Sequence, residues 1–147
     1  MKKLKVLVVD DSMLMRRMIS DMINEDQSIE VIDTAKNGRE LMDKLSFVMP
    51  DVITLDVEMP RMNGVEVLSE LKQRGINIPV IMLSSLSKSG ADITIRCLEL
   101  GAFDFIAKPS GAISLDISSL KEDLISKIKA AGLYKVNIDI SRRTDTR

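Results

Sequence analysis

Short apolar runs alternate with segments of helical spacing along most of this chain. The runs are rich in β-branched residues and cover 6–9, 31–32, 52–55, 80–83 and 103–106. Between them, apolar residues recur at steps of three and four, which is typical of helices with one buried face. The pattern predicts five strands alternating with helices. Because the strands are apolar almost throughout, we expect a parallel sheet covered by helices on both sides.

The predicted fold is therefore a three-layer, doubly wound α/β sandwich. The length of 147 residues is that expected of one domain, which we place at residues 1–132. After Gly132 the sequence loses clear periodicity and ends in polar residues. We interpret residues 133–147 as a linker or tail that leads toward an effector domain absent from this chain.

Charge and composition exclude several classes of function. The chain has 21 basic and 22 acidic residues, so it lacks the positive field that attracts DNA. No apolar run is long enough to cross a membrane, and the basic start of the chain leads into two aspartates without a cleavage site for a signal peptide. We expect a cytoplasmic protein that neither binds DNA nor inserts into a membrane.

The chain contains no histidine and only one cysteine, Cys97. An internal disulfide is thereby excluded, and a cysteine-based metal site is implausible. Any chemistry must depend on carboxylates, hydroxyls and amines.

Polar residues follow four of the five predicted strands. In an open parallel sheet, sites form beyond the carboxyl ends of the strands, near the point where strand order reverses. We expect one site to contain Asp10, Asp11, Asp56, Ser84 and Lys108.

Three converging carboxylates repel one another and favour a bound cation. Ligation by oxygen alone indicates a hard ion, Mg²⁺ or Mn²⁺. Asp56 ends the buried run VITLD, where core packing does not explain a carboxylate, so it is our candidate nucleophile for a phosphoryl group. The alternatives are a solvated turn with a helix cap at Asp10 and Asp11, and a turn-forming side chain at Asp56.

Four motifs in order resemble the response regulator receiver family. They are VLVVDDS, DVITLDVEMPRMNG, PVIMLSS and GAFDFIAKP, and the resemblance covers about residues 4–132. It implies a five-stranded parallel sheet with five helices and Asp56 as the phosphoacceptor. The implied metal ligands are Asp11, Asp56 and the backbone carbonyl of Glu58, with Asp10 acting through water. Ser84 and Lys108 would bind the phosphoryl oxygens.

Within this family, the chain is most similar to the receiver of chemotaxis protein-glutamate methylesterases. The resemblance implies a chemotaxis histidine kinase as phosphodonor and a methylesterase domain, acting on chemoreceptors, as the regulated partner. This chain has no G-x-S-x-G motif and no histidine, so we expect no esterase activity from it. The only reactions that we expect of this chain are its own phosphorylation and dephosphorylation.

Two positions bear on how such a receiver would switch. Phe105 stands where many receivers have tyrosine, so its ring can change rotamer but cannot donate a hydroxyl hydrogen bond. Glu58 places a carboxylate near the phosphoryl group, and the sequence does not give the direction of its effect.

Pro109 favours a fixed turn after Lys108, and the sequence does not determine whether the peptide bond between them is cis or trans.

The helix that begins near Ser89 carries two apolar stripes. One contains Ala91, Ile95, Leu98 and Ala102, and we assign it to the core. The other contains Ile93, Cys97 and Leu100, and we assign it to a partner surface. The alternative is that neighbouring helices bury much of both stripes.

Three other functions are alternatives for such a chain. A free-standing receiver would act by docking to another protein. An aspartyl-phosphate phosphohydrolase needs similar residues, but its nucleophile follows the first strand, whereas here the isolated acceptor follows the third. A dinucleotide-binding domain is disfavoured because G-x-G-x-x-G does not follow the first strand.

Overall fold

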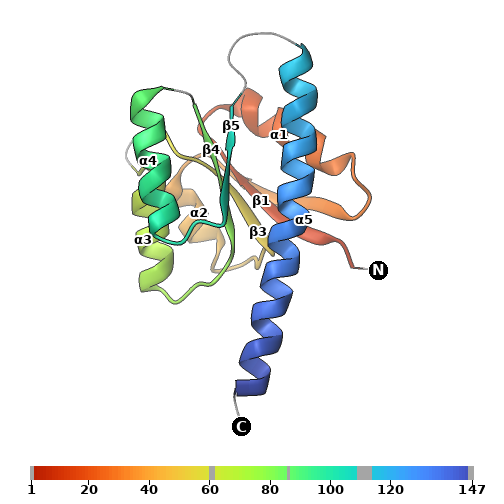
Figure 1. Cartoon of the computed structure of the whole chain (residues 1–147), viewed down its shortest axis with the longest axis vertical. Helices are drawn as coiled ribbons and strands as arrows, with labels where there is room; N and C mark the ends of the chain where they lie inside the picture. Colours follow the sequence, from red (N-terminus) through yellow and green to blue (C-terminus); the bar gives the residue numbers. More distant parts are fainter. Residues whose placement is uncertain (1, 60–61, 86, 109–113, 146–147) are drawn as a thin grey trace.

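The computed structural model describes residues 2–59, 62–85, 87–108 and 114–145. Five strands alternate with five helices over this part of the chain (Figure 1). In order they are β1 (Leu4–Val9), α1 (Met13–Asn24), β2 (Ile29–Ala35), α2 (Gly38–Lys44), β3 (Val52–Asp56), α3 (Gly64–Gln73), β4 (Val80–Ser84), α4 (Lys88–Glu99), β5 (Asp104–Ala107) and α5 (Ser114–Asp145).

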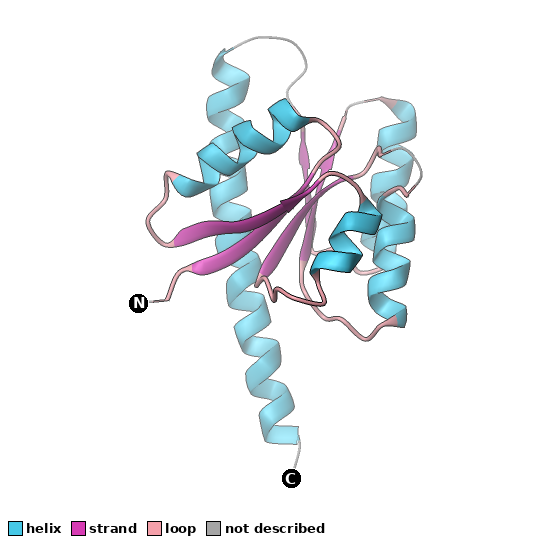
Figure 2. Cartoon of the chain, turned by 180° about the vertical axis from the view of Figure 1, so that it is seen from behind, coloured by secondary structure: helices cyan, strands magenta, loops and turns pink. Residues whose placement is uncertain are grey.

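The strands form one parallel sheet in the order β2-β1-β3-β4-β5. Helices α1 and α5 cover one face, and α2, α3 and α4 cover the other, with the twisted sheet between them (Figure 2). The predicted three-layer sandwich is confirmed. Strand order reverses between β1 and β3, so the carboxyl ends of these two strands open onto a crevice.

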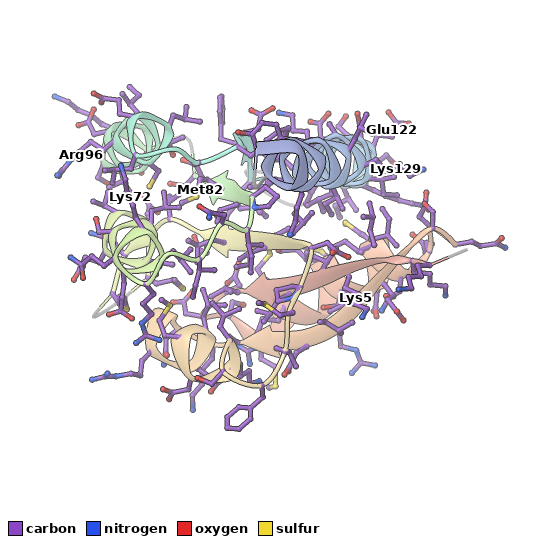
Figure 3. The ribbon with its side chains drawn as sticks, turned by 90° about the horizontal axis from the view of Figure 1, so that it is seen from below. Lys5, Lys72, Met82, Arg96, Glu122 and Lys129 are labelled. Atoms are coloured by element: carbon purple, nitrogen blue, oxygen red, sulfur yellow. The ribbon has the colours of Figure 1, made fainter. Side chains whose placement is uncertain are left out.

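Each face of the sheet has its own apolar core. Alternate residues of one strand point to opposite faces, so Val6 and Val8 pack against α1 and α5 while Leu7 and Val9 pack against the other three helices. Met82 lies between sheet and helices in Figure 3, whereas Arg96 projects outward from α4.

Polar side chains fix where four of the helices begin. Ser12, Asn37, Asn63 and Ser87 each accept a hydrogen bond from a backbone N–H in the first helical turn. Asn63 also forms a reciprocal capping box with Glu66. The turns that follow the strand ends are thereby anchored next to the crevice.

Helix α5 continues well beyond the body of the domain. It runs without interruption from Ser114 to Asp145 and projects below the sheet in Figure 1. The ring of Tyr134 packs against Phe103 with centroids 5.4 Å apart. The sequence pattern does not predict this helical extension, because apolar spacing weakens after Gly132. The boundary at residue 132 stays a prediction.

Thr54 offers a test of the core in the middle of β3. Its side chain is 1% exposed, and its hydroxyl has no hydrogen-bond partner among the described residues. A buried hydroxyl without a partner costs roughly 1–3 kcal/mol. We expect Thr54→Val to raise the free energy of unfolding by about 1 kcal/mol, as measured by chemical denaturation.

Thr94 is a matched control for this substitution. It is also buried, but its hydroxyl donates a 2.8 Å hydrogen bond to the backbone carbonyl of Gly90. Thr94→Val removes a satisfied bond, so no stabilisation is expected there. Equal destabilisation by both substitutions would contradict our interpretation of Thr54.

Candidate functional site

The carboxyl ends of β1 and β3 bring two buried aspartates together. Val9 pairs with Leu55 in the sheet, so Asp10 and Asp56, the next residues along each strand, lie side by side. Both side chains are almost fully buried, at 1% and 2% exposure. Apolar packing does not account for two adjacent carboxylates at this depth, so their positions indicate a site.

Lys108 reaches both carboxylates from the end of β5. Its ammonium nitrogen lies 3.0 Å from Oδ1 of Asp56 and 3.5 Å from Oδ2 of Asp10. The backbone N–H of Lys108 donates to the carbonyl of Ser84, which ties the ends of β4 and β5 together. One cation therefore faces two buried anions, which leaves negative charge in excess.

Burial dominates the electrostatics of the pair. It raises the pKa of Asp56 to about 6 from 3.8, although attraction to Lys108 and a hydrogen bond from the Glu58 N–H act in the opposite direction. Burial also raises the pKa of Asp10, against a backbone hydrogen bond from Ser12 and attraction to Lys108. Burial disfavours the charge on Lys108, but the two aspartates outweigh it and raise its pKa.

The donor set fits a hard divalent cation. Carboxylate oxygens of Asp10, Asp11 and Asp56 all lie within 4.8 Å of one another, and Asp11 is exposed to solvent beside its two buried neighbours. Three anionic oxygens with an open side suit Mg²⁺, which retains several waters and prefers carboxylate ligands. The roles of individual ligands, including the Glu58 carbonyl, stay predictions.

Ser84 lies at the end of β4, but its hydroxyl is engaged elsewhere. Its Oγ is 2.9 Å from the carbonyl of Ser85 and 3.2 Å from the carbonyl of Gly90. A hydroxyl has one hydrogen to donate, so here it serves backbone acceptors. The hydroxyl hydrogen of Ser84 is committed to these carbonyls, and its contact with a phosphoryl oxygen stays a prediction.

Residues 6–117 match the family model described as the response regulator receiver domain. The chain belongs to this family. The receiver is similar to protein-glutamate methylesterase/protein-glutamine glutaminase from Bacillus subtilis, with 56% identity over 88% of this chain. It is also similar to the protein of the same name from Treponema denticola, with 47% identity over 99% of this chain. It spans 36% and 39% of the length of these two relatives.

The solved structures include a similar domain. The response regulator domain of Thermotoga maritima CheB is 44% identical, with a TM-score of 0.78 over 89% of this chain and 97% of that one. The predicted resemblance to the receiver of methylesterases is confirmed. Within the described parts of the receiver, no helix combines the length and apolarity that a membrane span requires.

The assignment of the two stripes on α4 was wrong. Cys97 is fully buried, and Ile93 and Leu100 pack against the same core, so the predicted partner surface faces the sheet. Ile95 is 57% exposed and Leu98 is 36% exposed on the outer side of the receiver. Gly90, Thr94 and Cys97 are small, which lets their face of α4 lie close against the sheet.

Phe105 lies on the outer side of the receiver and is 43% exposed. Lys127 of α5, a residue that the sequence did not single out, donates a 2.6 Å hydrogen bond to the backbone carbonyl of Phe105. Its ammonium group also lies 5.4 Å from the ring centroid, within range of a cation–π contact. Whether the ring changes rotamer stays a prediction.

Arg16 and Ser87, which lie near the site, were missed from the sequence, and the contact of Ser85 with Glu58 was not predicted. Arg16 of α1 donates a 2.8 Å hydrogen bond to the carbonyl of Asp10 and so fixes the turn that carries it. Ser85 and Ser87 donate hydrogen bonds to the carboxylate of Glu58. No sequence motif marks the two contacts of Glu58, because they form between loops distant in sequence. Pro109, whose isomer was left open, lies outside the described residues.

Proposed function

We propose that the receiver is a phosphorylation-dependent regulatory domain that takes a phosphoryl group on Asp56. The observation that carries the proposal is the contact of buried Asp56 with Lys108, beside two further carboxylates at the reversal of strand order. Burial raises the pKa of Asp56 to about 6, so the carboxylate is still mostly ionised at pH 7 and available as a nucleophile.

The reaction transfers one phosphoryl group to a carboxylate. An oxygen of Asp56 forms a bond to phosphorus while the bond from phosphorus to the donor nitrogen or oxygen breaks, and the leaving group takes the bonding electrons. Lys108 offsets the charge on the transferred oxygens. The hydroxyl of Ser84 then turns away from the backbone carbonyls and donates a hydrogen bond to one of the phosphoryl oxygens. Bound Mg²⁺, held by the three aspartates, would reduce repulsion between phosphoryl and carboxylate oxygens.

We further propose a chemotaxis histidine kinase as phosphodonor and a methylesterase domain, acting on chemoreceptors in the cytoplasm, as the regulated effector. The similarity to whole methylesterases, of which this chain spans little more than a third, supports this assignment. A phosphohydrolase is less well supported, because the aspartate bound by Lys108 follows β3 rather than β1.

An apolar surface is available to report the change. Ser84 lines an open cavity of about 190 Å³ whose apolar lining includes Ala91, Ile95, Leu98, Phe105 and Ala107. A turn of Ser84 alters the wall of this cavity directly. We propose this surface, rather than the stripe of Cys97, as the part of the receiver that its effector senses.

Intact-mass measurement tests the proposed function. After incubation with Mg²⁺ and acetyl phosphate, the protein is expected to gain the mass of one phosphoryl group. A metal chelator should prevent the gain. A protein that binds Mg²⁺ in a titration and yet gains no mass would rule out the proposed reaction and leave the receiver as a docking module.

A further inference from the structure

The carboxylate of Glu58 connects two loops that border the phosphoacceptor site. Its Oε2 accepts a 2.9 Å hydrogen bond from the hydroxyl of Ser85, and its Oε1 accepts a 2.8 Å bond from the hydroxyl of Ser87. The two serine hydroxyls are themselves 2.9 Å apart. We call Glu58, Ser85 and Ser87 the Glu58 clamp, because they join the residues after β3 to those after β4.

The clamp is linked to the site at both of its ends. On one side, the backbone N–H of Glu58 donates to Oδ1 of Asp56. On the other, Ser87 caps α4 by accepting a hydrogen bond from the N–H of Gly90. The start of α4 is therefore held in place relative to the phosphoacceptor.

Both acceptors of the Ser84 hydroxyl belong to the segment that the clamp holds. The hydroxyl donates to the carbonyl of Ser85, whose side chain binds Glu58, and to the carbonyl of Gly90. The backbone of Gly90 also lies close against the clamp. A Cβ atom at this position would be 2.5 Å from Oε1 of Glu58 and 2.7 Å from Oγ of Ser85, which is too close for any residue other than glycine while the clamp is closed. Glycine thus lets the clamp close.

We propose that Glu58 is a positioning residue that holds the start of α4 in its resting place and so keeps the Ser84 hydroxyl directed toward backbone carbonyls. The inference rests on the proposed function, since it assigns Glu58 a part in how readily Asp56 accepts a phosphoryl group. Opening the clamp frees the carbonyls of Ser85 and Gly90 to move and releases Ser84. The arrangement that accepts phosphate is then more populated before any phosphate arrives.

Two substitutions at Glu58 separate hydrogen bonding from charge. Glu58→Ala removes the clamp, and we expect phosphorylation by acetyl phosphate to become roughly three- to ten-fold faster, because apparent reactivity scales with the competent fraction. Glu58→Gln removes the charge but can still bind both serine hydroxyls, so its rate should stay within about two-fold of wild type. Glu70→Ala, which alters an exposed ion pair on α3, serves as the control with an unchanged rate.

A spectroscopic measurement reports the position of α4 without chemistry. In metal-free protein, the amide resonances of Gly90 and Thr94 in Glu58→Ala should lie between those of wild type and those of wild type with Mg²⁺ and beryllofluoride. Glu58→Gln should resemble wild type. Gly90→Ala, which leaves the charge of Glu58 intact but forces the clamp apart, should shift Thr94 in the same direction as Glu58→Ala.

Equal acceleration by Glu58→Ala and Glu58→Gln would overturn the inference, because charge alone would then explain it. The inference would also be overturned if the amide resonances of Gly90 and Thr94 in Glu58→Ala stayed at their wild-type positions. If wild type itself accepts no phosphoryl group, the proposed function fails, while the comparison of metal-free Glu58→Ala with Glu58→Gln still decides whether the clamp positions α4.

Discussion

Asp56→Asn is expected to abolish phosphoryl transfer to the receiver while making its fold more stable. The amide cannot act as the nucleophile, and the neighbouring carboxylate of Asp10 lies farther from the Lys108 ammonium, at 3.5 Å against 3.0 Å for Asp56. Intact-mass measurement after treatment with acetyl phosphate and Mg²⁺ should therefore show no modified protein. This is the largest effect that we expect from any single substitution.

The gain in stability follows from the burial of Asp56. Its pKa is raised from 3.8 to about 6 even beside Lys108, so ionisation of Asp56 costs on the order of 3 kcal/mol more in the folded protein than in the unfolded chain. Asparagine is neutral and similar in shape, so the free energy of unfolding at pH 7.5 without metal should rise by about 2–3 kcal/mol. Denaturation by urea measures it.

Asp51→Asn is the matched control. Asp51 precedes β3 at the opposite end of the same strand, where its carboxylate accepts a hydrogen bond from the backbone N–H of Lys5. Its substitution should leave phosphorylation intact and stability nearly unchanged. If phosphorylation persisted in Asp56→Asn, the acceptor would have to be another residue.

The second large effect is a dependence of stability on pH in the absence of metal. The unfolded chain releases the Asp56 proton near pH 3.8, whereas the folded protein holds it up to about pH 6. The folded state therefore binds more protons in this window, and its stability should fall as pH rises from 4 to 7. Asp10 acts in the same direction, since its pKa is also raised by burial.

Histidine titration does not contribute in this window. The chain has no histidine. Asp26, with its pKa lowered to about 2 by hydrogen bonds from Ser28, stabilises the fold above pH 3.8 and loses that contribution only as the pH falls toward 2. Asp33, whose pKa is also lowered, acts in the same acidic range.

Urea denaturation at intervals between pH 4 and 7 measures this dependence. The total decrease in the free energy of unfolding should be about 3 kcal/mol. Saturating Mg²⁺ should remove most of the decrease, because a cation binds the ionised carboxylates of the folded state. Asp56→Asn should show a smaller decrease, to which Asp10 still contributes. A flat wild-type profile without metal would contradict the assignment of two buried, destabilising carboxylates at the site.

Much of the site follows from topology alone, which is why the sequence predicted it. Asp56 and Ser84 end their strands, and Asp10 and Lys108 directly follow theirs. Parallel strands in one sheet bring these positions to the same edge. Their mutual proximity needs no knowledge of loop conformation.

The face of α4 could not be derived in the same way. Two apolar stripes lie nearly opposite each other on this helix, and periodicity gives no preference between them. What decides the outcome is close packing: Gly90, Thr94 and Cys97 allow α4 to approach the sheet, and this depends on the space left by α3.

Contacts between loops were also beyond the sequence. Glu58 drew attention because of its position, but its partners Ser85 and Ser87 are 27 and 29 residues away. Whether a carboxylate projects into solvent or binds a neighbouring loop depends on tertiary geometry that local patterns do not encode.

Helix α5 gives the receiver a mechanical property as well as a chemical one. At 1.5 Å per residue, its 32 residues form a rod about 48 Å long, with its upper part seated on the sheet and its lower part projecting past Tyr134. A rod of that length is a lever arm: a tilt of roughly 10° about its upper end displaces the far end by about 8 Å. A tilt of β5, which is joined to the helix by the hydrogen bond from Lys127, would therefore move the far end of α5 by a larger distance than the strand itself.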